Sequence, residues 1–193
     1  MFDSLELIDR ALLLRINSLH HPALDIFMWY MSKTLPTIML VFAVAFTVYR
    51  KFNPRKALEF LVSCAIVFAC TDLSSNAFKH GIKRYRPTHN LEIKEQVRIV
   101  NAYSGGKYGF FSGHAANTFG VVTFMFLCVN WISRRYRWLV FIYPFVVVYS
   151  RMYLGVHYPS DILAGIIDGV LFGWLGFMVT NKYFLKLDEQ GIQ

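Results

Sequence analysis

Long apolar runs separated by short polar connectors dominate the chain. The last three runs approach the roughly 20 apolar residues that a helix needs to cross a bilayer, whereas the first two are shorter. The second is expected to continue as a helix through Lys79. The runs are Leu35 to Tyr49, Ala57 to Leu73, Ala115 to Ile132, Trp138 to Val156 and Ile162 to Thr180. The pattern predicts an all-α, polytopic membrane helix bundle.

Two further segments precede these runs. Between Asp3 and Leu19, apolar residues recur at helical spacing, which predicts an N-terminal amphipathic helix at the membrane interface. The stretch Ala23 to Met31 is a candidate sixth membrane element, although its short length and Asp25 argue against a full span. It could also merge with the following run. We therefore expect five to six transmembrane helices plus the amphipathic helix.

Composition agrees with a membrane setting. The chain has 193 residues, of which 55% are hydrophobic and 17% charged, so one domain over residues 1–193 is expected. Its net charge of +8 lies mostly in the connectors, which indicates contact with a lipid bilayer and argues against nucleic acid as a partner. The cysteines lie inside apolar runs without metal-ligand spacing, which predicts reduced thiols.

The basic connectors predict an orientation. Arg50, Lys51, Arg55 and Lys56 join the first two runs, and Arg134, Arg135 and Arg137 join the third and fourth. Basic connectors usually face the cytoplasm. The long connector over residues 78–112 and the short one around His157 then lie together on the extracytoplasmic face of the cell (inner) membrane. The long connector is basic too, and we expect its charges to serve a site there.

The first candidate motif runs from Lys79 to Arg86 and Pro87. Lys79 and Arg86 are seven residues apart, which predicts one shared helix face with Lys83 between them. Pro87 is expected to end the helix. A guanidinium fork and an ammonium group together suit a phosphoryl group. The same pattern is as typical of a basic helix that binds anionic lipid head groups.

The second motif, Phe111-Ser112-Gly113-His114, stands directly before an apolar run. Ser112 can cap the helix, whose free N–H groups attract an anion, and Gly113 lets the backbone approach a ligand. His114 has the pKa range for reversible proton transfer. The alternative is an interfacial histidine bound by loop carbonyls.

The third motif joins Ser150, Arg151, His157 and Asp161. An arginine in an apolar helix end is costly and therefore a functional candidate. Asp161 lies in the first turn of the fifth run, where its carboxylate can bond one nitrogen of His157 and leave the other as a nucleophile. The alternative is a helix-capping Asp161 paired with Arg151, which leaves His157 unexplained.

These motifs resemble the signature of the type 2 phosphatidic acid phosphatase family, which reads Lys-x6-Arg-Pro, Pro-Ser-Gly-His and Ser-Arg-x5-His-x3-Asp. The resemblance extends from Lys79 to Asp161, and the first and third motifs match in full. Phe111 replaces the usual proline, which affects only the expected rigidity of that loop.

The resemblance implies specific roles and no metal ion or other cofactor. His157 would attack phosphorus, Asp161 would orient it, and His114 would protonate the leaving oxygen. The implied phosphate-binding residues are Lys79, Arg86, Ser112, Gly113 and Arg151.

Other polar residues lie within the runs. Asp72, Ser74, Ser75 and Asn76 are expected to line the neighbourhood of the site in supporting roles. Asp168 lies among glycines at four-residue spacing, which favours a structural role in helix packing over proton relay.

The sequence thus predicts an integral membrane phosphatase that hydrolyses a lipid phosphate or diphosphate through a phosphohistidine. Candidate substrates are undecaprenyl diphosphate, lipid A phosphate, phosphatidylglycerophosphate and phosphatidic acid, and we favour a polyprenyl diphosphate or lipid A. The alternatives are a lipid phosphotransferase of the same family and a non-catalytic phospholipid transporter or sensor.

Overall fold

The computed structural model describes residues 2–182, without the side chains of residues 2–4, 134 and 135, so residues 183–193 of the expected domain lie outside it. In this range an isolated antiparallel bridge between Tyr85 and Tyr108 accompanies the helices. In chain order the elements are α1 (Phe2–Asn17), α2 (Pro22–Met31), α3 (Thr34–Lys51), α4 (Pro54–Ile82), η1 (Pro87–His89), η2 (Lys94–Gln96), α5 (Gly113–Cys128), α6 (Arg134–Arg137), η3 (Trp138–Phe141), α7 (Ile142–Tyr153) and α8 (Pro159–Thr180).

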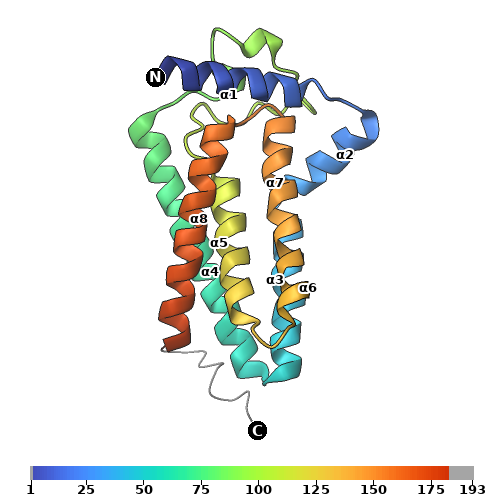
Figure 1. Ribbon diagram of the computed structural model, residues 1–193, viewed down its shortest axis with the longest axis vertical. Coiled ribbons are helices and arrows are strands. Elements are labelled where there is room, and N and C mark those ends of the chain that lie inside the picture. Colours follow the sequence, from blue (N-terminus) through green and yellow to red (C-terminus); the bar gives the residue numbers. More distant parts are fainter. Residues whose placement is uncertain (1, 183–193) are drawn as a thin grey trace.

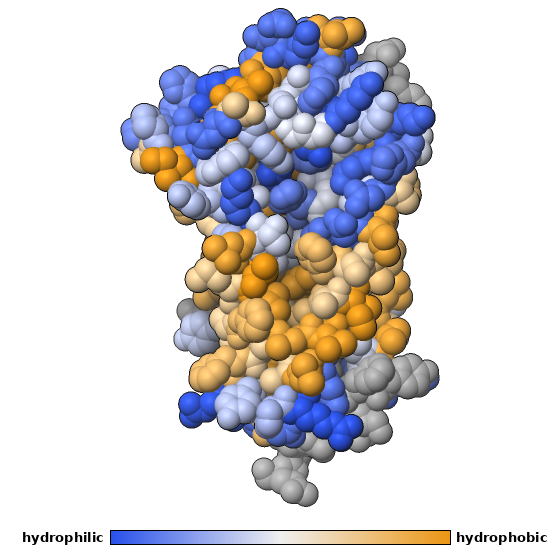
Figure 2. All heavy atoms as spheres, turned by 180° about the vertical axis from the view of Figure 1, so that it is seen from behind, coloured by the Kyte–Doolittle hydropathy of each residue, from blue (hydrophilic) through white to orange (hydrophobic). Residues whose placement is uncertain are grey.

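The long helices run side by side, and α1 lies across one end of them (Figure 1). Helices α3, α4 and α8 are long and apolar enough to cross a membrane, and α5 and the segment Trp138–Tyr153 are shorter apolar helices. Figure 2 shows, on one face of the molecule, an apolar belt between two polar ends. The predicted all-helical membrane bundle is confirmed.

Helix α2 is too short to be the sixth span that the sequence left open. It has 10 residues, so it is about 15 Å long, half of the roughly 30 Å hydrocarbon core of a bilayer. It does not merge with α3, because Ser32 ends it and Lys33 adopts an extended backbone before α3 begins. Within the described residues, five apolar helices form the bundle.

Helix α5 occupies the centre of the bundle. Thirteen of its 16 residues are buried, and it ends at Cys128, four residues before the end of the third apolar run. It packs closely against α8 through glycines. A Cβ atom on Gly169 would lie 2.4 Å from the carbonyl oxygen of Ala116. The four-residue glycine spacing therefore brings the two backbones together.

Helix α1 is fastened to the site end by a buried carboxylate. Asp9 is 3% exposed and accepts hydrogen bonds from Nη2 of Arg84 at 2.8 Å and from the backbone N–H of Ser160 at 3.0 Å. Arg10, the next residue, pairs with Glu92 of the long connector at the surface. Apolar side chains of α1 remain exposed, as expected of a helix at the membrane interface: Leu5, Ile8 and Leu12.

Replacing Gly169 by alanine is expected to lower the stability of the bundle by about 1–3 kcal/mol, because the new methyl group meets backbone atoms that have no room to move. Gly81→Ala is the matched control, since nothing lies within 4 Å of its added Cβ atom. Thermal unfolding in detergent measures both, and equal melting temperatures for the two variants would contradict the close packing.

Replacing Asp9 by alanine is expected to cost about 1–3 kcal/mol, because Arg84 and the N–H of Ser160 lose a buried acceptor. Glu92→Ala removes an exposed ion pair of the same helix and should change stability by less than about 0.5 kcal/mol. Unfolding midpoints that shift equally for both variants would show that the buried contact does not fasten α1.

Candidate active site

The three motifs meet at the end of the bundle that α1 covers. Predicted site residues line one cavity of about 230 Å³ there: Lys79, Arg86, Gly113, His114 and His157. The other three predicted residues do not line it and are fully or almost fully buried: Ser112, Arg151 and Asp161. The connectors over residues 83–112 and 154–158 therefore bring distant parts of the chain to one place.

His157 lies in the short connector between α7 and α8 and is 1% exposed. Its Nε2 atom lies 3.1 Å from Nη1 of Arg86, and its Nδ1 atom lies 3.5 Å from Oδ2 of Asp161. Burial holds the pKa of His157 well below its usual range, and the charges of Arg86, Arg151 and Lys79 lower it further. The imidazole is therefore neutral near pH 7, and one ring nitrogen keeps a lone pair.

Asp161 is held by two donors in the first turn of α8. Its Oδ1 atom accepts a hydrogen bond from Nη1 of Arg84 at 2.7 Å, and its Oδ2 atom accepts one from the backbone N–H of Tyr158 at 3.1 Å. The alternative of an Asp161–Arg151 pair is wrong, because Arg84 takes that place. Arg84 also reaches Asp9, so its guanidinium connects α1, the long connector and α8.

The expectation that Lys79, Lys83 and Arg86 share one helix face is wrong. Helix α4 ends at Ile82, and Lys83 has a left-handed backbone with a φ of 56° and an exposed side chain. The chain then turns, and the N–H of Arg86 donates to the carbonyl oxygen of Lys107 at 3.1 Å. Arg86 therefore reaches His157 from the connector, across the cavity from the end of α4.

Arg86 is only 9% exposed, and main-chain oxygens hold its guanidinium. Its Nε atom donates to the carbonyl oxygen of Tyr108 at 3.1 Å, and Nη1 donates to that of Val156 at 3.4 Å. Gly105 has a φ of 68°, and a Cβ atom there would lie 2.9 Å from Nη1. Glycine thus lets the connector fold directly over the guanidinium.

The N-terminus of α5 meets the end of α4 at the cavity wall. Ser112 caps α5, and the ammonium of Lys79 donates to the hydroxyl of Ser75 at 3.2 Å. A Cβ atom on Gly113 would lie 3.1 Å from that ammonium, so glycine permits the approach. The free N–H groups of the first helical turn and the ammonium together favour a bound anion. His114 is the next residue and lines the same cavity.

Arg151 is the most buried of the site cations, at 1% exposed. Its Nη2 atom donates to the hydroxyl of Tyr103 at 2.9 Å, and its Nε atom has no partner among the described residues. Burial and the charge of Arg151 lower the pKa of Arg86. The two guanidinium groups are therefore close enough to repel each other.

The site cations have no carboxylate partner. In the part of the chain that the structure describes, no ion pair joins an Asp or Glu to Lys79, Arg86 or Arg151. Residues 2–182 likewise hold no group of three or more His, Cys, Asp or Glu side chains arranged for a metal ion. A phosphate dianion would supply the missing negative charge.

Phe111, which stands in place of the family's proline, is 3% exposed. Its ring packs against Phe78 of α4, with 5.2 Å between the ring centroids. The loop before α5 is therefore anchored by aromatic packing.

Sequence reasoning missed three contributors to this site: Arg84, Asp9 and Tyr103. Arg84 lies inside the first motif, two positions before Arg86, and this position could have marked it as a candidate site residue. Asp9 and Tyr103 are far in sequence from the residues they bind, so no local pattern could reveal them.

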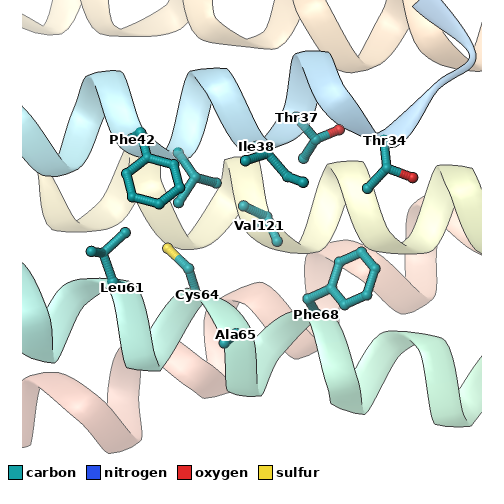
Figure 3. Close-up of a pocket in the computed structure, with 10 residues that line it drawn as sticks. Thr34, Thr37, Ile38, Phe42, Leu61, Cys64, Ala65, Phe68 and Val121 are labelled. Atoms are coloured by element: carbon teal, nitrogen blue, oxygen red, sulfur yellow. The ribbon is translucent and has the colours of Figure 1, made fainter.

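A second, apolar cavity of about 390 Å³ adjoins the first and opens between α3 and α4 over α5 (Figure 3). Thr34, Thr37 and Phe68 line both cavities. The rest of the second cavity is lined by apolar side chains and Cys64. The site is therefore continuous with a groove suited to a hydrocarbon chain.

Comparison with solved structures supports the fold. The chain is similar to a transmembrane PAP2-type phosphatidylglycerolphosphate phosphatase from Bacillus subtilis, with a TM-score of 0.71 and 21% identity over 93% of this chain and 88% of that one. It is also similar to Aquifex aeolicus LpxE, with a TM-score of 0.67 and 22% identity over 87% and 93% of the two chains.

Sequence relatives are more similar. Lipid A 4'-phosphatases of Porphyromonas gingivalis and Bacteroides thetaiotaomicron are each 34% identical, over 89% and 98% of this chain and 72% and 84% of theirs. An undecaprenyl-diphosphatase of Sulfolobus acidocaldarius is 37% identical over 43% of this chain and 39% of its own. The PAP2 superfamily model matches residues 56–184, which include all three motifs. As the motifs indicated, the chain belongs to the PAP2 superfamily.

Proposed function

We propose that this membrane phosphatase removes a phosphate from a glycolipid of the lipid A type through a phosphohistidine formed on His157. The observation that carries the proposal is that the buried Arg86 and Arg151 and the half-buried Lys79 have no carboxylate ion pair among the described residues and surround a neutral histidine. Unpaired positive charge in a cavity is energetically costly, and a bound phosphate group would offset that cost. Phosphoryl transfer depends mainly on such positioning and charge stabilisation.

In the proposed reaction, Nε2 of His157 attacks phosphorus and the bond from phosphorus to the lipid oxygen breaks. The bound phosphate dianion favours the protonated form of His114, which donates its proton to that oxygen, and the oxygen leaves as the lipid alcohol. Water then attacks the phosphohistidine, His114 takes a proton from the water, and phosphate leaves as the His157 lone pair is restored. Lys79, Arg86, Arg151 and the N–H groups after Ser112 bind the phosphoryl oxygens.

Asp161 supports this reaction through the tautomer of His157. Its Oδ2 atom lies 3.5 Å from Nδ1, so it favours a proton on Nδ1 and leaves Nε2 as the nucleophile. Arg84 holds the other carboxylate oxygen at 2.7 Å and thereby orients Asp161. Asp161 also offsets the positive charge that the ring gains as phosphohistidine forms.

The substrate class is proposed from relatives that cover most of the chain. Two of them carry the name lipid A 4'-phosphatase and align over 89% and 98% of this chain, whereas the undecaprenyl-diphosphatase aligns over 43%. The apolar groove beside the cavity suits a substrate that remains in the bilayer.

We also propose that the site faces the extracytoplasmic side of the inner membrane. The basic connectors of α3–α4 and α5–α7 lie at the opposite end of the bundle (Figure 1). The long connector is basic as well, but its arginines serve the site end: Arg84 binds Asp9 and Asp161, Arg86 lies at His157, and Arg98 binds Asp25 at 2.9 Å. Because these side chains have local roles at this end, the basic connectors of the opposite end are the better guide to orientation.

Replacing His157 by alanine is expected to reduce phosphate release from lipid A by about a thousandfold or more, because the nucleophile is lost. His80→Ala, an exposed histidine outside the cavity, is the matched control and should retain full activity. The assay is run in excess EDTA, where wild-type activity should persist. Retained activity in His157→Ala, or a strict requirement for divalent metal, would refute the mechanism.

Replacing His114 by alanine is expected to lower lipid A hydrolysis by roughly 100-fold or more, because the leaving alkoxide is no longer protonated. The initial burst of 4-nitrophenol from 4-nitrophenyl phosphate should fall much less, since this leaving group needs no proton and the burst precedes the attack of water on the phosphohistidine. Labelled lipid quenched with base should leave phosphate on His157 in wild type. Equal losses for both substrates would show that His114 is not the proton donor.

The orientation can be tested with single cysteines in a variant whose native cysteines are replaced by alanine. Gly106→Cys is suitable because Gly106 is exposed and nothing lies within 4 Å of its added Cβ atom. An impermeant thiol reagent should label it on intact cells. Lys51→Cys, exposed at the other end, should react only after permeabilisation. The reverse labelling would place the site in the cytoplasm.

A further inference from the structure

The lining changes character from the polar cavity to the apolar cavity beside it. On α4 and α5, which wall both cavities, the lining residues pass from cationic or imidazole groups through a polar belt to apolar side chains. From the site end inward, the order is Lys79, Asp72, Phe68 on α4 and His114, Asn117, Val121 on α5. The belt of Asp72 and Asn117 therefore lies between the place for the phosphate and the groove for the hydrocarbon chain.

Asp72 is a carboxylate that the proposed reaction does not use. It precedes Lys79 by two helical turns and lies roughly 10 Å deeper along α4. Its Oδ2 atom accepts a hydrogen bond from Asn76 at 2.9 Å, and its Oδ1 atom accepts one from Asn117 of α5 at 3.2 Å. A carboxylate can accept about four hydrogen bonds, so acceptor capacity remains at the cavity wall. A carboxylate inside a membrane-spanning helix has a high free-energy cost and is therefore a functional candidate.

We propose that Asp72 and Asn117 form a subsite for the leaving alcohol, and that this alcohol presents hydroxyl or amide N–H donors, as an acylated sugar does. The inference rests on the proposed function, because the phosphate must lie at His157 for the alcohol to reach the belt. Asn117 fixes one oxygen of Asp72 and leaves the carboxylate turned to the cavity it lines.

A plain alkyl or prenyl alcohol fits this belt poorly. Methylene groups of its chain would lie against Asp72 and displace water without offering a donor, which is unfavourable for a charged group. A sugar ring replaces that water with its own donors, and a hydrogen bond to a charged acceptor is stronger than one to a neutral acceptor. The acyl chains then continue into the apolar cavity between α3 and α4 (Figure 3).

Asp72 also has two roles that do not involve the alcohol. It links α4 to α5 through Asn117, and its negative charge attracts Lys79. Loss of either role would weaken the hydrolysis of every phosphate ester to the same degree. Only contact with the alcohol makes the loss depend on whether the substrate carries donors.

The test compares lipid A with dodecyl phosphate, a phosphomonoester whose alcohol has no donor, in the same detergent micelles. Asp72→Ala is expected to lower kcat/KM for lipid A by about tenfold or more and that for dodecyl phosphate by no more than about threefold. Asp72→Asn, which keeps the shape but loses the charge, should fall between wild type and Asp72→Ala on lipid A and answers the question if the alanine variant does not fold.

Asp168→Asn is the matched control, because this intramembrane carboxylate bonds Ser74 on the α8 side of α4 and does not line the cavity. It should leave the ratio of the two kcat/KM values unchanged. Equal losses on both substrates in the Asp72 variants would overturn the subsite while the phosphatase function stands. Wild-type protein that releases phosphate from neither lipid would instead overturn the proposed function and the subsite with it.

Discussion

The burial of positive charge without a carboxylate partner is the constraint on which the site depends. Arg86 and Arg151 are at most 9% exposed, and Lys79 joins them from the end of α4. Their partners among the described residues are carbonyl oxygens, hydroxyl groups, an asparagine amide and His157. Neutral partners satisfy the donors but leave the charge in place. Burial of His157, together with the same positive charge, lowers its pKa and keeps it deprotonated, so the buried cations contribute to both the phosphate site and the nucleophile.

Glycines allow backbone segments to approach the buried cations and each other closely. Gly113 brings the start of α5 beside Lys79, and Gly105 lets the connector cover Arg86. Gly169 lets α8 press against α5, so that Asp161 at the start of α8 lies beside Ser112 at the start of α5. A methyl group at any of these positions would push a charged or reacting group away from the cavity.

Carboxylates are present at the site end, but they are directed to other tasks. Asp161 and Asp9 both bind Arg84, which connects the amphipathic helix α1 to the connector and to α8. Asp25 binds Arg98 of the same connector. These pairs hold α1 and the long connector over the site. They leave Lys79, Arg86 and Arg151 free to bind the substrate. Asp72, lower in the cavity, is placed where a phosphate would not reach but its alcohol would.

Local patterns in the sequence were sufficient for the helical membrane bundle and for the residue types of the site, because hydrophobic run length and motif spacing are properties of neighbouring residues. They failed where the backbone departs from regularity, as at Lys83, whose left-handed conformation sends Arg86 to the other wall. They also could not reveal the contacts of Arg84 with Asp161 and with Asp9 of α1, or that of Asn117 with Asp72. Those contacts join residues 45 to 77 positions apart, and only packing of the folded helices brings such partners together.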